Sequence, residues 1–216
     1  MSSFPQHLLE GYRTFTSQRL PTEQSRYREL SEIGQAPEVM VIGCCDSRGS
    51  PEAIFDAGPG ELFVVRNIAN LVPVYQPDGG AHGVSAALEY AVSVLRVKHI
   101  VVLGHAQCGG IRAFIDNIEP LSPGDFIGRW MSMFIKPGER VEQRDHETMQ
   151  DFTIRIEKAA VFRSLENLLT FPFVRAAVER GDLSLHGAYF GVAEGSLFVL
   201  DPAAKEFHSV REKVSE

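Results

Sequence analysis

Short, uninterrupted apolar runs are the feature of this sequence that most limits its fold. They cover residues 39–43 (VMVIG), 62–65 (LFVV) and 99–104 (HIVVLG). Runs of this length without polar alternation are typical of strands buried on both faces of a sheet. Between the second and third run, residues 81–95 carry apolar side chains at helical spacing, which predicts a helix with one apolar face. Strands that alternate with helices favour an α/β domain with a largely parallel central sheet flanked by helices.

The rest of the chain predicts further elements around this sheet. They are a turn at Gly109-Gly110 into a helix, a surface excursion over 119–147 with a short helix near 127–135, helices over 152–169 and 172–180, and strands over 185–192 and 196–200. Residues 5–30 are polar with scattered apolar positions, which predicts one or two helices without a strong core-facing stripe. We therefore expect an N-terminal helical arm over residues 1–34 and a single α/β domain over residues 35–216.

Length and composition exclude several classes of protein. A chain of 216 residues with 44% hydrophobic residues suits one domain with a sizeable core. Its 21 basic and 28 acidic residues give a net charge of −7, which argues against a nucleic-acid partner. We find no apolar run of about 18 residues, so no membrane span is expected, and no secretory signal pattern at the start. Three cysteines, two of them adjacent, argue against a disulfide framework and favour the cytoplasm, where thiols stay reduced.

Two cysteines and one histidine lie where predicted strands end. Cys44 follows the first strand, and His105 and Cys108 follow the third. Functional groups gather beyond the carboxyl ends of parallel strands, so we expect the three side chains to meet. Two thiolates and one imidazole are typical of a catalytic zinc ion with an open fourth position. Because cysteine is often a small buried hydrophobe, the spacing alone leaves a structural role open.

Asp46 and Arg48 follow Cys44 closely and sharpen the metal interpretation. A carboxylate two residues from a ligand can reach the metal ion or its water, and an arginine can pair with that carboxylate through two hydrogen bonds. The alternative is an acidic residue that caps a turn and forms a surface ion pair.

Three sequence motifs occur in a fixed order along the chain. They are residues 43–48 (GCCDSR), 59–70 (PGELFVVRNIAN) and 104–110 (GHAQCGG), with looser similarity at 86–92 and 185–187. On these motifs the sequence resembles the β-class carbonic anhydrases over about residues 30–200. It is more similar to the plant-type branch than to the branch inhibited by bicarbonate, which has tryptophan and tyrosine where this chain has Val41 and Phe190. Only Arg66 of that second set is present, so a separate bicarbonate site is not expected.

The resemblance implies a cofactor, an activity and a set of site residues. It implies one Zn²⁺ per subunit, bound by Cys44, His105 and Cys108. Either Asp46 or water would be the fourth ligand in a resting form. It also implies reversible hydration of carbon dioxide to bicarbonate and a proton, by attack of a zinc-bound hydroxide that the Asp46–Arg48 dyad orients. Five residues would line the substrate cleft: Gln35, Phe63, Ile68, Tyr90 and Gly109. In that family the cleft lies at a dimer interface, so Gln35, Phe63 and Tyr90 would serve the neighbouring subunit.

Other interpretations stay open at this stage. A related zinc enzyme could hydrolyse carbon disulfide or carbonyl sulfide, and a non-catalytic protein could bind bicarbonate as a regulator. A thiol redox protein is disfavoured because the chain has no Cys-x-x-Cys. Phe63, Ile68 and Tyr90 could simply pack in the core. The polar arm and the shared cleft both predict a homodimer or homotetramer.

Overall fold

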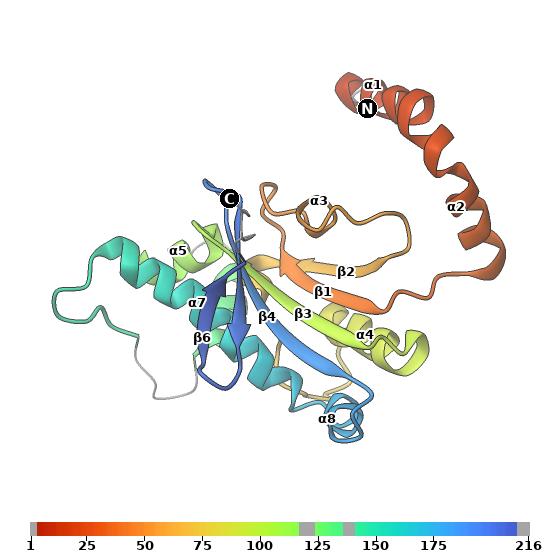
Figure 1. The fold of residues 1–216 in the computed structure, drawn as a ribbon. Coiled ribbons are helices and arrows are strands. Elements are labelled where there is room, and N and C mark those ends of the chain that lie inside the picture. Colours follow the sequence, from red (N-terminus) through yellow and green to blue (C-terminus); the bar gives the residue numbers. More distant parts are fainter. Residues whose placement is uncertain (1–3, 117–123, 136–140, 211–216) are drawn as a thin grey trace, which may run out of the picture.

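A six-stranded sheet forms the centre of the computed structural model, which describes residues 4–116, 124–135 and 141–210 (Figure 1). The strands are β1 (Val39–Cys44), β2 (Leu62–Asn67), β3 (His99–His105), β4 (Ser184–Gly191), β5 (Ser196–Asp201) and β6 (Glu206–Ser209), in the order β2-β1-β3-β4-β5-β6. The strands β2, β1, β3 and β4 run parallel to one another. At the β4 edge, β5 pairs antiparallel with β4, and β6 pairs antiparallel with β5. The prediction of a largely parallel sheet in an α/β domain is confirmed.

The position of β1 in the sheet brings two loops together. Val39 pairs with Leu62 of β2 on one side and with His99 of β3 on the other. The chain therefore leaves β1 for β2 and returns across β1 to β3, which makes a topological switch point between β1 and β3. Crevices beyond the carboxyl ends of strands at such a point are where ligands bind in open α/β sheets.

Helices cover one face of the sheet and leave the other largely to short segments. The helices of the domain are α3 (Pro51–Ile54), α4 (Gly83–Glu89), α5 (Gly109–Asp116), α6 (Phe126–Met131), α7 (Met149–Leu168) and α8 (Pro172–Glu179). The main core lies between the sheet and α4, α7 and α8, with Met40 and Ile42 of β1 facing it. Gly104 allows α7 to approach β3 closely, because a Cβ there would lie 2.7 Å from Cγ2 of Val161.

The boundaries of some elements differ from the prediction. The helix expected over residues 81–95 is α4 followed by a π-helical stretch, Tyr90–Leu95. Gly109 and Gly110 lie inside α5 rather than in a turn before it. Short α3 and edge strand β6 were not predicted. Part of the excursion over 119–147 lies outside the described residues, and its described part contains α6 and a 3₁₀ turn, Ser132–Phe134.

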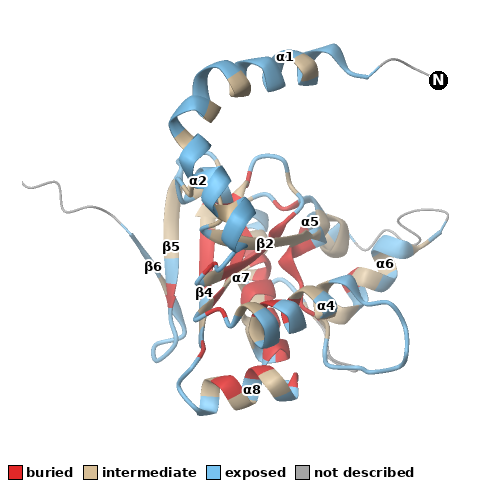
Figure 2. Cartoon of the chain, turned by 90° about the vertical axis from the view of Figure 1, so that its right-hand side faces the viewer, coloured by how far each residue is buried: buried red, intermediate tan, exposed pale blue. Residues whose placement is uncertain are grey.

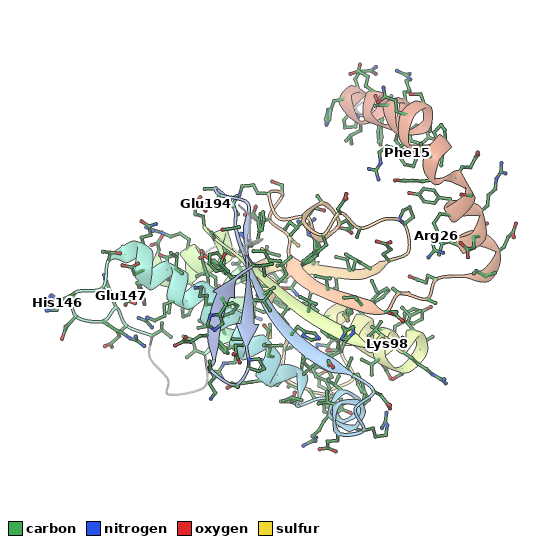
Figure 3. The ribbon with its side chains drawn as sticks, in the orientation of Figure 1. Phe15, Arg26, Lys98, His146, Glu147 and Glu194 are labelled. Atoms are coloured by element: carbon green, nitrogen blue, oxygen red, sulfur yellow. The ribbon has the colours of Figure 1, made fainter. Side chains whose placement is uncertain are left out.

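The N-terminal arm projects away from the sheet, as Figures 1 and 2 show. It consists of α1 (Gln6–Thr14), a π-helical turn (Phe15–Arg19) and α2 (Leu20–Ile33), none of which contains a buried residue. Its described contacts with the domain include a hydrogen bond from Arg26 Nε to the Pro59 carbonyl, at 3.3 Å. Arg26 and Phe15 are labelled in Figure 3. No described helix, in the arm or the domain, is long and apolar enough to cross a membrane.

Candidate metal centre

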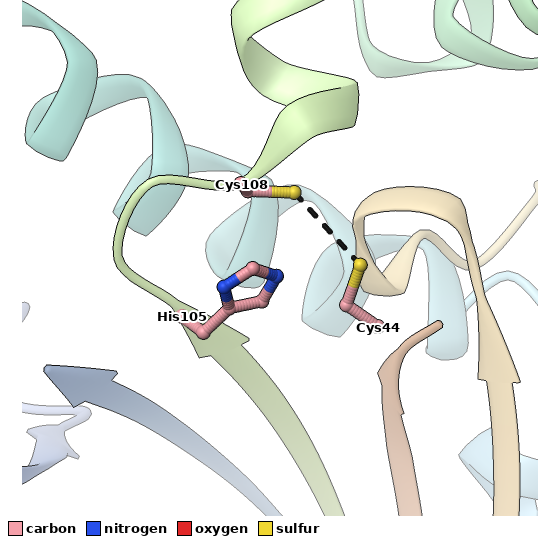
Figure 4. A group of neighbouring side chains, drawn as sticks. All are labelled: Cys44, His105 and Cys108. Carbon is pink, nitrogen blue, oxygen red and sulfur yellow. Dashed lines mark hydrogen bonds between the residues drawn. The ribbon is translucent and has the colours of Figure 1, made fainter. Parts of the chain in front are cut away.

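Cys44, His105 and Cys108 converge beyond the carboxyl ends of β1 and β3. Cys44 ends β1, His105 ends β3, and Cys108 directly precedes α5. All three are buried, and their candidate ligand atoms lie within 4.8 Å of one another. Figure 4 shows the two sulfurs and the imidazole pointing toward a common point, with 3.9 Å between the Sγ atoms of Cys44 and Cys108. The structure therefore brings together the three side chains that the sequence predicted to meet.

The imidazole of His105 is oriented to act as a ligand. Its Nδ1 lies 2.9 Å from the carbonyl oxygen of Ala106. Because a carbonyl can only accept, Nδ1 carries the proton and Nε2 keeps its lone pair. Nε2 is buried and has no hydrogen-bond partner, a state that costs about 1–3 kcal/mol for a typical buried polar group. A metal ion at the centre of the cluster would satisfy this atom.

The two thiols share one proton without a metal. A hydrogen bond from Cys108 lowers the pKa of Cys44 to about 4, and the proximity of His105 and of the backbone of Asp46 and Ala69 lowers it further. The same hydrogen bond and burial raise the pKa of Cys108. Burial disfavours a charged His105, but contact with the Cys44 thiolate outweighs this and raises the histidine's pKa. Metal binding would displace the shared proton, because thiolates and neutral imidazoles are the ligating forms.

The donor set fits zinc. Two thiolates and one imidazole suit Zn²⁺ with one position left open, and their two negative charges balance the charge of the ion. Within the described residues no fourth histidine, cysteine or carboxylate joins the group.

Asp46 and Arg48 lie side by side next to the centre. Oδ1 of Asp46 accepts from Nε of Arg48 at 2.9 Å, and Oδ2 accepts from Nη2 at 2.7 Å. These hydrogen bonds lower the pKa of Asp46, so the group stays a carboxylate. Nη2 also donates to the Gln107 carbonyl at 2.9 Å. One guanidinium therefore joins the loop after β1 to the loop before α5.

Glu157 of α7 is a site residue that the sequence analysis missed. Only 2% of it is exposed. Its Oε1 accepts from the backbone nitrogen of Cys108 at 2.9 Å, and its Oε2 accepts from the hydroxyl of Tyr189 at 2.7 Å. Burial raises the pKa of Glu157. A signal was present, since position 157 shares a helix face with buried Ala160 and Val161.

Ile68 and Gly109 lie next to the loop that carries Cys108, and their role in lining a substrate cleft stays a prediction. Gly109 follows Cys108 directly, and a Cβ on the next residue, Gly110, would lie 2.6 Å from Cγ2 of Ile68. Nε1 of Trp130 donates to the Ile68 carbonyl at 2.8 Å, so Trp130 packs the excursion against the domain.

Phe63, Tyr90 and Gln35 do not join the metal centre of their own chain. The rings of Phe63 and Tyr90 pack with centroids 5.9 Å apart. Phe63 precedes Asn67, the residue paired with Cys44, by four positions, which is about 13 Å along a strand. Exposed Gln35 lies before β1, farther from its carboxyl end.

Val41, Arg66 and Phe190, which occupy the positions of the separate bicarbonate site of the other branch, have structural roles in this chain. Arg66 donates from Nε to the Cys44 carbonyl and from Nη2 to the Asp46 carbonyl, both at 2.7 Å. Val41 and Phe190 pack together on the sheet face opposite α7. Arg66 thus supports the loop after β1.

Comparisons with known proteins agree with this geometry. A family model described as carbonic anhydrase matches residues 39–197. Beta carbonic anhydrase 3 of Arabidopsis thaliana is 36% identical over 195 residues, which cover 88% of this chain and 74% of that relative. The chain belongs to the β-carbonic anhydrase family. Members of the family are carbonate dehydratases, a class of lyases.

Further β-carbonic anhydrases extend the comparison. The chloroplastic beta carbonic anhydrase 5 of A. thaliana is 38% identical over 174 residues, and the match spans 78% of this chain but 55% of that relative's length. The structure of the β-carbonic anhydrase CcaA superposes with a TM-score of 0.85 at 27% identity, covering 97% of this chain and 93% of CcaA. A structure from work on two tetrameric β-carbonic anhydrases of Sordaria macrospora gives a TM-score of 0.77 at 30% identity, covering 90% of this chain and 95% of that one.

Proposed function

We propose that this protein catalyses the reversible hydration of carbon dioxide to bicarbonate and a proton, at one zinc ion per subunit. The observation that carries the proposal is the buried convergence of Cys44, His105 and Cys108 with an unpaired Nε2, in a chain of the carbonic anhydrase family. A zinc ion held there would lower the pKa of a bound water and supply a nucleophile at neutral pH.

Asp46 and Arg48 would orient the nucleophile. Arg48 donates to both carboxylate oxygens of Asp46, which fixes the carboxylate and keeps it ionised. Oδ1 also accepts the backbone N–H of Arg48, whereas Oδ2 accepts one hydrogen bond and retains a lone pair. Oδ2 can therefore accept a hydrogen bond from the attacking water and orient the water's lone pair toward carbon dioxide. As a fourth metal ligand in a resting form, Asp46 would first have to turn away from Arg48.

The surroundings suit a small apolar substrate. The cluster around the centre includes Leu71, Ile111 and Met131, each no more than 2% exposed. With Ile68 at its edge, this wall would exclude water from the reacting carbon. Carbon dioxide carries no charge and needs no cationic clamp.

We further infer that the active unit is a homodimer or a larger homo-oligomer. Tyr90 is 44% exposed and pairs with Phe63, far along the strand from the chain's own centre. Together with Gln35, these residues would line the cleft of a neighbouring subunit. The exposed arm supports this inference.

All three cysteines are free, which supports a reducing compartment such as the cytoplasm.

The test measures zinc per subunit together with carbon dioxide hydration by stopped flow. The wild-type protein should hold one zinc ion and hydrate carbon dioxide, and Cys108→Ser should lose both. Cys45→Ser is the matched control, because Cys45 is exposed and lies next to Cys44, and it should keep both. A folded, fully zinc-loaded wild-type protein that hydrates no carbon dioxide would overturn the proposal. Assays with carbonyl sulfide and carbon disulfide on the same sample would then show whether either is the substrate.

A further inference from the structure

His99 and His186 form a second meeting point of metal-ligating side chains, at the opposite end of the sheet. His99 begins β3, and His186 is the third residue of β4. His99 pairs with Ser184 and Val101 pairs with His186, so the two histidines are diagonal neighbours on one face. Lys98, labelled in Figure 3, marks this end of the sheet. His99 lies six residues before His105, about 20 Å along the strand.

The two imidazoles meet through their nitrogens rather than their faces. Nδ1 of His99 lies 3.2 Å from Nε2 of His186. The ring centroids are 5.2 Å apart and the planes are inclined by 56°, so the rings are not stacked in parallel. Without a metal ion, one nitrogen donates a single proton to the other.

This separation matches the bite of two imidazole ligands on one metal ion. Zinc–nitrogen bonds are about 2.0–2.1 Å long. Two such bonds whose nitrogens are 3.2 Å apart enclose an angle of about 100°, close to the tetrahedral value. The metal ion would lie about 1.3 Å to one side of the line between the two nitrogens, so each ring would turn to direct its lone pair at the ion in place of the shared proton. The paired strands hold both backbones in place.

We propose that His99 and His186 bind a divalent transition-metal ion of the kind that imidazole favours, such as zinc, nickel or copper. His186 is exposed and His99 is half-buried, so an ion can enter from solvent. Among the described residues only the first centre gathers three ligand side chains, so water would complete the coordination here. The site binds more weakly than the buried centre for that reason.

The neighbouring charges are compatible with a cation. The carbonyl of Glu38 accepts the backbone N–H of His99 at 3.1 Å. The carboxylate of Glu38 pairs with Lys98, and the ammonium lowers its pKa. The cation of Lys98 is therefore already neutralised, and Glu38 supplies a nearby carboxylate that a bound ion would attract.

The test is a titration of the full-length, zinc-loaded protein with Ni²⁺ by calorimetry in a non-coordinating buffer. One nickel ion per chain should bind beyond the zinc already present. His186→Gln should weaken nickel binding at least tenfold, and His99→Gln should do the same. His208→Gln is the control, because His208 is an exposed histidine on β6 and should leave nickel binding unchanged.

Two results would overturn the proposed nickel site. One is that the wild-type protein binds no nickel under these conditions, and the other is that nickel binds as tightly to both the His99 and His186 variants as to the wild type. His186 is exposed, so its variant should fold even if the His99 variant does not. Hydration activity measured without nickel should be unchanged in His186→Gln. The nickel titration does not depend on that activity, so failure of the proposed function would leave this test intact.

Discussion

The carboxylate of Asp46 is fixed by the side chain of one neighbour, Arg48, and its catalytic role can be separated from metal binding. Asp46→Asn leaves all three metal ligands in place but removes the negative charge that Arg48 pairs with and replaces one of the two acceptor oxygens with an NH₂ donor. We expect normal zinc content and a loss of hydration activity of about 10²-fold or more, the usual size of such proton-handling contributions.

Metal analysis and stopped-flow turnover of the same preparation check this prediction. Asp182→Asn is a matched control, because Asp182 pairs with Arg180 at 2.8 Å on the surface, away from the centre. Wild-type turnover in Asp46→Asn with full zinc would exclude the assigned role.

Glu157 accepts a hydrogen bond from the backbone N–H of the metal-ligand candidate Cys108, and its removal should weaken metal binding. Glu157→Ala leaves the Cys108 N–H and the Tyr189 hydroxyl without their buried acceptor. Loss of such outer partners commonly costs 10- to 100-fold in metal affinity, about 1.4–2.8 kcal/mol. Glu157→Gln retains an acceptor for the Cys108 N–H and should lose less.

Competition with a chelator measures the zinc affinity of each variant. Glu166→Ala on the same helix, where Glu166 is exposed, should behave like the wild type. An unchanged affinity in Glu157→Ala would show that Cys108 is positioned without the glutamate.

The positions of Cys44 and His105 at the ends of predicted strands indicated the metal ligands, but nothing in the sequence indicated the hydrogen bonds that hold the ligands in place. Cys44 and His105 are recognisable because each ends a buried apolar run. For Glu157 the apolar neighbours Ala160 and Val161 indicate only that its helix face is buried. Its link to the centre is not recognisable, because its partners Cys108 and Tyr189 lie 49 and 32 residues away.

At the scale of elements, an ion pair fastens the segment before α7 to that helix. Arg155 Nε and Nη2 donate to the two carboxylate oxygens of Glu147 at 2.7 and 2.8 Å. These hydrogen bonds lower the pKa of Glu147 from 4.5 to about 2. A depressed carboxyl pKa means that the pair contributes its full stability above about pH 4.5 and loses it as the pH falls through about 2.

Glu147→Gln should therefore lower the unfolding midpoint most above about pH 4.5 and least near pH 2. Thermal unfolding of both proteins across this range measures the difference. Asp145→Asn in the same segment, where Asp145 is exposed, serves as the comparison. A midpoint difference that stays constant from pH 2 to 7 would mean that the ionised pair is not responsible.

Long apolar elements were predictable, whereas short or exposed ones were not. β1, β2 and β3 follow from uninterrupted apolar runs, because both of their faces are covered. β6 has four residues and three of them are exposed, so it carries no hydrophobic pattern. α3 has a single turn, and nothing in the apolar spacing distinguishes the π-helical stretch after α4 from an ordinary helix.

At the scale of the whole molecule, the arm should govern assembly. Its exposed apolar side chains include Phe4, Tyr12 and Ile33, which are 62%, 64% and 74% exposed. Removal of residues 1–34 should convert the protein to a smaller species and lower hydration activity, because the neighbour's cleft would lose Phe63 and Tyr90.

Analytical ultracentrifugation and the hydration assay on the truncated chain check both effects, and zinc content shows whether the domain still forms its centre. If the truncated chain forms an oligomer with the same number of subunits as the wild type, the arm has no part in assembly. The strand register was needed for this prediction, because sequence alone does not tell how far Phe63 lies from Cys44.

The switch point between β1 and β3 also couples metal binding to folding. Cys44 and Cys108 are 64 positions apart and meet only once β3 has docked beside β1. An unfolded chain offers only His105 and Cys108 at short spacing, so an ion held by all three side chains would bind the folded state more tightly than the unfolded one. Removal of a bound metal ion should therefore lower the unfolding midpoint.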